Sequence, residues 1–114
     1  MTSIILNHNF RRHVLHYYNK FAWLWITWPD VNLRDPTMGI ELATRACELS
    51  SWQDWSCLFT LAAACGEIGA FDKAVHWADK ALELAPEENQ ADCSCQLQRY
   101  RAGQPYDAAL RPQG

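Results

Sequence analysis

Apolar residues recur along most of this chain at intervals of three and four positions, which is the spacing of one face of an α-helix. The first such run covers about residues 10–28, and Pro29 ends it because the residue before a proline is pushed out of the helical region. The second begins at Asp35-Pro36, where aspartate can cap free N–H groups and proline suits the first helical position, and it ends near Leu49. Since strand-like alternation is nearly absent, the pattern predicts an all-α fold.

A third helix is expected over about residues 52–68. Ser51 and Asp54 resemble a capping box at its start, with aspartate in place of the usual glutamate. Gly69 follows the last apolar residue of the run and is typical of a helix end, because glycine takes the left-handed conformation without strain.

Two further helices follow. One is expected over about residues 71–84, and Pro86 separates it from another over about 87–101, which Gly103 closes. The remaining residues, 104–114, contain prolines and a glycine and are predicted to form a loose tail. Because the turns are short, we expect the helices to pack as antiparallel hairpins in a single domain that ends before this tail.

Part of the chain is repeated, since residues 39–49 return in altered form as residues 74–84. The identical pairs are Ala43 and Ala78, Ala46 and Ala81, Glu48 and Glu83, and Leu49 and Leu84. A repeat of this length is typical of stacked units, each of which cannot bury its apolar face alone. Such units form surfaces for partners far more often than they form active sites.

The block of residues 55–86 resembles a tetratricopeptide repeat, a family unit of two antiparallel helices over 34 residues. The matching residues are Leu61 and Ala62 at the family's Leu-Gly pair, Gly69 at the inter-helix turn, Phe71 at its aromatic position, Ala74 and Ala81 at its small positions, and Pro86 at its closing proline. Cys65, Ala78 and Leu58 depart from the family's usual aromatic residues.

The block of residues 15–49 looks like an earlier copy, with Phe21 and Ala22 at the Leu-Gly pair and an enlarged turn over residues 29–36. That turn is similar to a variant of bacterial tetratricopeptide proteins, including arrays attached to serine/threonine kinases. The resemblance implies two helical hairpins plus a C-terminal capping helix over about 87–102, in a short right-handed solenoid.

The same resemblance implies a concave groove lined by the first helix of each repeat. Carried over residue by residue, its lining is His16, Asn19, Lys20, Trp23 and Thr27 from the first copy, Ser56, Phe59, Ala63 and Glu67 from the second, and Gln90, Cys93 and Leu97 from the capping helix. Such a mixture suits an extended or helical peptide. Phe59 and Thr60 stand where the family's clamp for a C-terminal carboxylate needs Lys and Asn, which disfavours that ligand. Trp23 and Phe59 could instead pack on each other, and this alternative stays open.

Composition narrows the class of protein. The 114 residues suit one domain. The net charge is −3, with a basic start and acidic later helices, and the chain lacks the dense basic stripe of nucleic-acid-binding proteins.

Five cysteines form no recognisable disulfide framework, which indicates a reducing, cytoplasmic setting. The apolar run at residues 4–6 is too short for a signal peptide, and residues 21–28 fall far short of the roughly 20 needed to cross a bilayer. We therefore expect no nucleic-acid or membrane partner.

Candidate chemistry is sparse. No phosphate loop, nucleophile elbow or metalloprotease motif occurs, so we expect neither an enzyme nor a bound cofactor. His13 and His16 lie one helical turn apart and could share a metal with His8, but no carboxylate or cysteine accompanies them closely. Cys93 and Cys95 would point to different sides of a helix, which disfavours a metal or redox pair.

The predicted function is a non-catalytic module that binds a protein or peptide segment in its groove. One alternative is an architectural spacer, or a remnant of a longer array, with no ligand of its own. Another is a small metal- or thiol-dependent protein that uses its histidines and cysteines. Because two repeats are fewer than the roughly three usually needed for stability, self-association is also expected, and Trp25 and Trp28 would fit a lateral interface.

Overall fold

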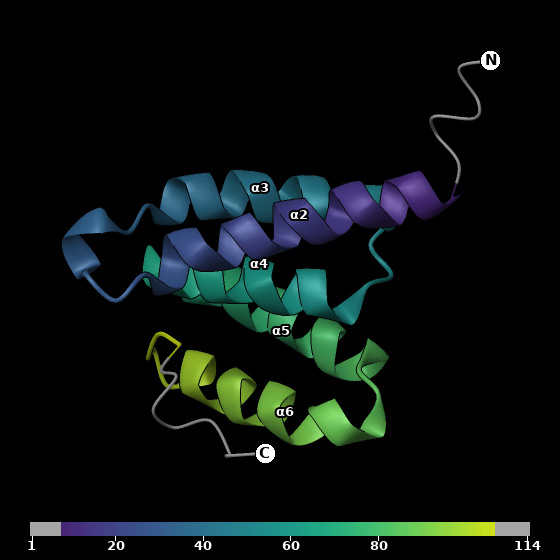
Figure 1. Ribbon diagram of the computed structural model, residues 1–114. Coiled ribbons are helices and arrows are strands. Elements are labelled where there is room, and N and C mark those ends of the chain that lie inside the picture. The colour runs from purple at the N-terminus through teal and green to yellow at the C-terminus, as the bar shows by residue number, and fades with distance from the viewer. Residues whose placement is uncertain (1–7, 107–114) are drawn as a thin grey trace.

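The computed structural model describes residues 8–106, which form α-helices and one short 3-10 helix in chain order (Figure 1). The elements are α2 (His8–Thr27), η1 (Val31–Leu33), α3 (Pro36–Leu49), α4 (Trp55–Glu67), α5 (Phe71–Leu84) and α6 (Glu87–Arg101). No strand forms within these described residues. The expected all-α fold is therefore confirmed.

The turn between α2 and α3 is organised by two aspartates. The Asp30 carboxylate accepts a hydrogen bond from the Asn32 backbone N–H at 3.0 Å, which starts η1. The Asp35 carboxylate accepts from the Met38 N–H at 3.0 Å, and Pro36 occupies the first turn of α3. Such caps satisfy N–H groups that have no partner inside the helix. The start of α3 is therefore set locally, as its sequence predicts.

The start of α4 differs from the sequence prediction. Ser51 and Trp52 have φ angles of 54° and 62°, a left-handed conformation that an α-helix does not contain. The Trp52 ring stacks on Trp77 of α5, with ring centroids 5.0 Å apart, instead of entering α4. Asp54 is the cap, and its carboxylate accepts from the Ser56 N–H at 2.9 Å. The capping box expected at Ser51 is wrong, because a tertiary contact holds that segment in a turn.

Glycines close two of the later helices. Gly69 follows α4 with a φ angle of 79°, and Gly103 follows α6 with a φ angle of 70°. Only glycine adopts this backbone region without steric cost, so both positions end a helix as expected. The bounds predicted for α5 and α6 also agree with the structure.

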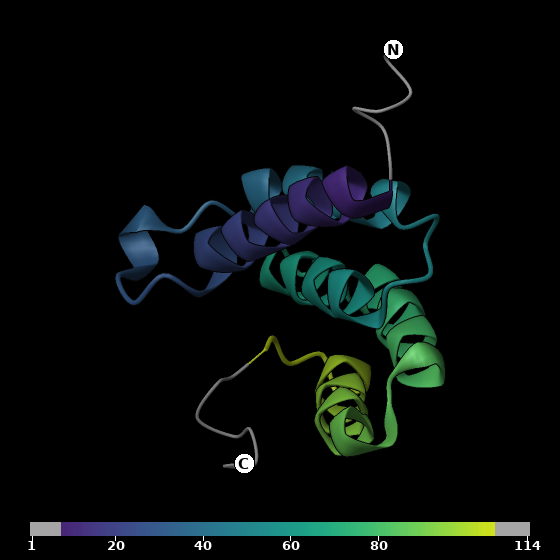
Figure 2. The same ribbon diagram turned by 45° about the vertical axis from the view of Figure 1, so that its right-hand side comes forward.

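Each helix packs on its neighbour in the chain, and α4 also contacts α2. Figures 1 and 2 show α2 and α3 lying along each other on one side of α4 and α5, with α6 on the other side. Helix α4 is therefore the central element, and most of its residues are buried.

Helices α2 and α3 approach each other closely at Gly39. A Cβ atom there would lie 2.5 Å from Cγ2 of Ile26 and 3.4 Å from the carbonyl oxygen of Ala22. Because glycine lacks this atom, the two helices can pack backbone against side chain at this point. The position of α2, which carries five of the twelve predicted groove residues, depends on this contact.

The core combines small side chains at helix contacts with a few large ones. Most of the residues assigned to repeat packing are buried in one cluster: Ala22, Leu61, Ala62, Ala74 and Ala81. Phe71 is half-buried and packs against this cluster. Gly69 lies in the turn after α4, and Pro86 is exposed just before α6. Leu58, Leu97 and Tyr100 are larger buried members of the same cluster and contribute more apolar area than any alanine.

Candidate functional site

Side chains from α2, α4 and α6 enclose a groove of about 330 Å³. Its lining residues are His16, Asn19, Lys20 and Trp23 of α2, Trp55, Ser56, Phe59 and Thr60 of α4, and Asn89 and Asp92 of α6. The structure thus places these predicted residues around one open space: His16, Asn19, Lys20, Trp23, Ser56 and Phe59.

An aromatic cluster borders the groove. The ring centroids of Trp23 and Phe59 are 5.9 Å apart, and Trp55 meets Phe59 edge-on at 6.1 Å. Tyr106, from the segment after α6, meets Trp23 edge-on at 4.9 Å and Phe59 at 6.2 Å. Edge-to-face contacts at such separations are favourable. Trp23 and Phe59 therefore do pack on each other, and the Tyr106 ring contacts both of them.

The segment that carries Tyr106 folds back toward α4 (Figure 2). The Arg99 Nε–H donates to the Pro105 carbonyl at 2.9 Å, and the Gln104 N–H donates to the Arg99 carbonyl at 2.8 Å. Pro105 also lies near α4, where a Cβ on Gly66 would be 3.8 Å from its Cα. Residues 104–106 thus differ from the loose tail expected for them, and residues 107–114 lie outside the described part of the chain.

Three predicted groove residues do not face the open groove. Ala63, Cys93 and Leu97 are buried in the core. On α6 the groove is lined instead by Asn89 and Asp92, each one residue before a predicted position. Helix α6 is therefore turned by about 100° from the register that the family resemblance implies. The residues of α6 that line this groove are therefore neighbours of those that the resemblance implies.

Two other predicted groove residues use their polar groups within the chain. The Thr27 hydroxyl donates to the Trp23 carbonyl at 2.7 Å, one turn earlier in α2. The Gln90 side-chain amide donates to the Ala85 carbonyl at 3.2 Å. Neither residue lines the open groove, so neither is positioned to meet a ligand there.

Glu67, the last predicted groove residue, joins the enlarged turn to α4. Its carboxylate lies 3.6 Å from the guanidinium of Arg34, whose Nε–H also donates to the Trp28 carbonyl at 2.6 Å. Burial raises the pKa of Glu67, and the positive charge of Arg34 acts in the opposite direction. Arg34 thereby ties the turn to the end of α2 and to α4.

Asn19 links α2 to the start of α4. Its Nδ2 group donates to Ser56 Oγ at 3.3 Å, and that hydroxyl donates to the Asp54 carboxylate at 2.6 Å. Asn19 Oδ1 is buried and accepts no hydrogen bond within residues 8–106. Because this oxygen has almost no exposed surface, a ligand in the open groove cannot reach it without a rearrangement of the Asn19 side chain.

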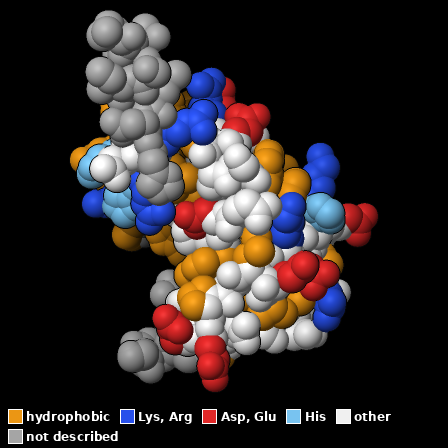
Figure 3. Space-filling view, turned by 90° about the vertical axis from the view of Figure 1, so that its right-hand side faces the viewer, with side chains coloured by type: hydrophobic (Ala, Val, Ile, Leu, Met, Phe, Trp, Pro, Cys, Tyr) orange, Lys and Arg blue, Asp and Glu red, His pale blue; other side chains and the backbone are white. Residues whose placement is uncertain are grey.

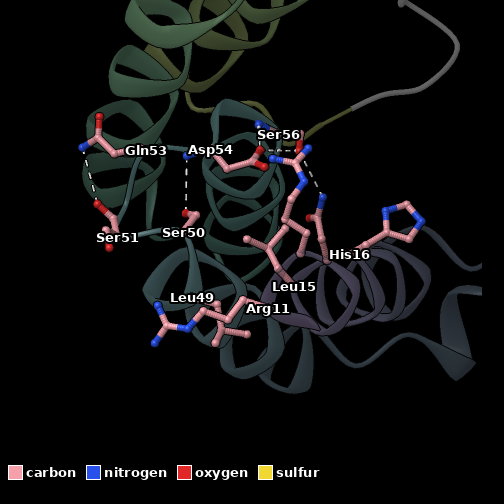
Figure 4. A pocket seen from close by; sticks show the side chains of 11 residues that line it. Arg11, Leu15, His16, Leu49, Ser50, Ser51, Gln53, Asp54 and Ser56 are labelled. Atoms are coloured by element: carbon pink, nitrogen blue, oxygen red, sulfur yellow. Dashed lines mark hydrogen bonds between the residues drawn. The ribbon is translucent and has the colours of Figure 1, made fainter. Parts of the chain in front are cut away.

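A second pocket of about 460 Å³ adjoins the groove at the N-terminus of α4. Figure 4 shows Arg11 and His16 of α2 on one side of it, opposite Asp54 and Ser56. His16, Asn19 and Ser56 line both pockets, so the two form one continuous concave surface.

The walls of this concave surface differ in charge. Helix α2 contains arginine, lysine and histidine but no acidic residue, whereas α6 begins with Glu87 and Glu88 and places Asp92 at the groove. Figure 3 shows basic and histidine side chains around the N-terminal end of α2 and acidic side chains over the lower part of the molecule, where α6 lies. A ligand with charges of both signs would therefore find complementary walls.

The cysteines offer little nucleophilic chemistry. Cys47, Cys57, Cys65 and Cys93 are all buried, and Cys95 is half-buried. Burial raises the pKa of Cys47 to about 12 and that of Cys93 to about 11, and it also raises the pKa of Cys57 and Cys65. Because the thiolate is the reactive form, these four thiols are poor nucleophiles at neutral pH.

A metal centre finds no support in the described residues. Within them, no three His, Cys, Asp or Glu side chains gather closely enough to hold an ion. The site considered at His8, His13 and His16 includes His8, whose side chain lies outside the description.

Comparison with known proteins gave no match: no family model, no curated protein and no solved structure matches this chain. The resemblance to tetratricopeptide repeats therefore rests on its residues alone and stays a prediction. Among the described helices, none combines the length and apolar character required to cross a membrane.

Sequence reasoning missed Tyr106, the residue that covers the aromatic cluster. The one available signal was that it is the only aromatic residue after α6. Its contacts with Trp23 and Phe59 join residues far apart in the sequence, so no local pattern could have placed it there.

Proposed function

We propose that this chain is a non-catalytic protein-interaction module that binds an extended peptide segment with an aromatic side chain in the groove between α2, α4 and α6. We also propose that its helices form two tetratricopeptide-like hairpins and a capping helix in a short right-handed solenoid. Two features support this arrangement: the packing of each helix on its chain neighbour, and the further contact between α2 and α4.

The observation that carries the proposal is the chain's own segment 104–106. It reaches the groove helices without forming a helix or a strand, and it presents one aromatic ring, Tyr106, to Trp23 and Phe59. A partner peptide with a similarly placed aromatic residue would make the same ring contacts. The open groove beside this cluster gives room for the residues that flank such an anchor.

Polar groups in the open groove support an extended ligand. The Lys20 and Asp92 side chains stand on opposite walls. Charged side chains of the peptide can meet the lysine and the aspartate. Central aromatic contacts with a polar surround are the usual anatomy of a peptide or protein interface.

The test uses the full-length chain with Tyr106→Ala, which uncovers Trp23 and Phe59. A fluorescent peptide with the sequence of residues 103–114 is titrated into this variant and into the unaltered chain, and binding is read by fluorescence anisotropy. A tethered segment competes at an effective concentration on the order of millimolar. We therefore expect the peptide to bind the variant at least about tenfold more tightly than the unaltered chain.

The matched control is the same peptide with its tyrosine replaced by alanine, which should lose most of its affinity. A display library of aromatic-containing peptides extends the search beyond the chain's own sequence. If the folded Tyr106→Ala variant binds neither the peptide nor any library member, the groove is not a peptide site.

A second candidate function is an architectural spacer, and one observation favours it. Tyr106 already covers part of the aromatic surface, so this region needs no external ligand for burial. In that case Tyr106→Ala should lower stability and create no affinity for added peptides.

A further inference from the structure

A row of large apolar side chains lies along α2 on the side away from its packed face. Tyr17, Phe21, Leu24, Trp25, Trp28 and, from η1, Leu33 form this row, which we call the outer stripe, and each is between 38% and 58% exposed. The packed face of the same helix is different, since Ala22 and Ile26 there are buried. The outer stripe is therefore an apolar surface without cover from the described chain.

The spacing of the outer stripe is that of a helix–helix seam. Residues 14, 17, 21, 24 and 28 alternate steps of three and four, and all five are apolar or aromatic. This alternation places them on one narrow strip of the helix, as in the packed positions of a coiled coil. Tyr17 and Phe21 already stack on each other along the strip, at a centroid distance of 6.4 Å. Such a seam fits the side of another long helix.

The size of the outer stripe matches what a dimer interface needs. A fully covered aromatic side chain buries about 150–250 Å², so the four half-exposed rings and the two leucines present on the order of 500 Å². A monomer rarely exposes more than a patch of about this size without a function for it. Two copies placed face to face would bury about 1,000 Å², the lower bound for a specific interface.

Charge selects a second copy in the antiparallel direction. Helix α2 carries no acidic residue, and its start holds Arg11 and Arg12. The turn beyond its other end holds Asp30 and Asp35, and the Arg34 of that turn is paired with Glu67. A parallel pair would place the two basic starts at the same end of the dimer. An antiparallel pair instead sets the basic start of each helix beside the acidic turn of the other, which is favourable.

The same antiparallel pairing is self-complementary residue by residue. If Phe21 of one copy faces Leu24 of the other, Tyr17 faces Trp28 in the same register. A two-fold axis makes every such contact occur twice. A shallow hollow of about 370 Å³ between Phe21, Leu24, Trp25, Trp28 and Leu33 would receive side chains of the second copy.

We infer that the outer stripe is a homodimer interface in which the α2 helices of two copies pack antiparallel about a two-fold axis. The inference does not use the groove, which lies on another face of α2. A failure of the dimer therefore leaves the proposed peptide site untouched, and a failure of the peptide site leaves the dimer untouched.

Two charge variants of the full-length chain test the inference by sedimentation velocity over a concentration series. Phe21→Lys and Leu24→Glu each place an unpaired charge in the seam, so each alone should weaken the dimer by at least about tenfold. Ile68→Lys is the matched control, because Ile68 is also exposed and lies outside the stripe. Far-ultraviolet circular dichroism of all variants confirms that the helices remain.

Mixing the two variants tests the direction of packing. In the antiparallel register the lysine of the Phe21→Lys chain would face the glutamate of the Leu24→Glu chain, so the mixture should recover the dimer that each variant lacks. In a parallel register these charges would not meet, and a mixture that stays monomeric would overturn the antiparallel arrangement. An unaltered chain that is monomeric throughout the series, or a dimer that both variants retain, would overturn the interface itself.

Discussion

The two tryptophan-bearing faces of α2 have opposite surroundings. Trp23 faces α4 and is covered by Phe59 and by Tyr106 from the end of the described chain. Trp25 lies two residues later, about 200° around the helix, and is exposed. The same residue type on one helix thus meets an internal partner on one face and solvent on the other. What separates the two faces is their angle relative to the helices that α2 packs against.

The two faces also differ in chemistry. The groove face combines aromatic rings with Asn19, Lys20 and a neighbouring acidic residue, so it can orient a ligand as well as bury it. The outer stripe is almost wholly apolar and offers a seam for a helix. A polar, continuous groove suits an extended peptide, whereas a long apolar strip suits another helix.

The greatest loss of stability should come from a change that disturbs both faces together. Gly39→Leu would force a side chain against Ile26 and the Ala22 carbonyl, where even a Cβ atom would lie only 2.5 Å from Ile26 Cγ2. Overpacking of this kind should lower the free energy of unfolding by about 3 kcal/mol. Urea unfolding followed by circular dichroism measures the loss. Glu41→Leu on exposed α3 surface is the control, and equal stability of the two variants would contradict the close approach of α2 and α3.

The next effect separates the two tryptophans. Trp23→Ala should lower the unfolding free energy by about 1–2 kcal/mol, because it removes ring contacts with Phe59 and Tyr106. Trp25→Ala should change it by less than about 0.5 kcal/mol when measured at concentrations where the chain is monomeric. Thermal and urea unfolding of both variants provide the comparison. Equal losses would mean that the two faces are not different after all.

A smaller effect is expected from the residue that covers the groove face. Tyr106→Ala should lower the unfolding free energy by about 1 kcal/mol, since its ring is half-buried and makes two aromatic contacts. It should also increase acrylamide quenching of Trp23 fluorescence, measured in a chain whose other tryptophans are replaced by phenylalanine. Unchanged quenching would show that Tyr106 does not cover Trp23 in solution.

The weakest effect concerns the pH dependence of stability and the contact of Glu67 with Arg34, in the turn between α2 and α3. Burial raises the pKa of Glu67 in the folded chain above its usual 4.5, with Arg34 opposing the rise. The folded state therefore holds the proton more tightly than the unfolded state, and this contribution to stability is present at low pH and lost as pH rises through the raised pKa. Glu67→Gln should remove this pH-dependent contribution. Between acidic and neutral pH, the unfolding free energy of the variant should therefore fall less than that of the unaltered chain. Glu83→Gln, an exposed change on α5, should keep the original pH profile in the same unfolding series.

Several features of this protein follow from short stretches of its sequence. The all-α fold and most helix bounds could be predicted from apolar spacing and from Asp35, Pro36, Gly69 and Gly103, because caps and glycine turns act within a few residues of themselves. The family resemblance, rather than this spacing, named His16, Asn19, Lys20 and Trp23 of α2, and these four residues line the groove.

Other features arise only where distant segments meet. Trp52 leaves α4 because it stacks on Trp77, α6 turns Asn89 and Asp92 toward the groove, and Tyr106 covers Trp23. Each depends on the relative rotation and approach of helices far apart in the chain, which packing selects among many locally equivalent arrangements. Local residue patterns therefore specify which segments are helical, whereas contacts between distant helices select which of their faces are covered and which stay exposed.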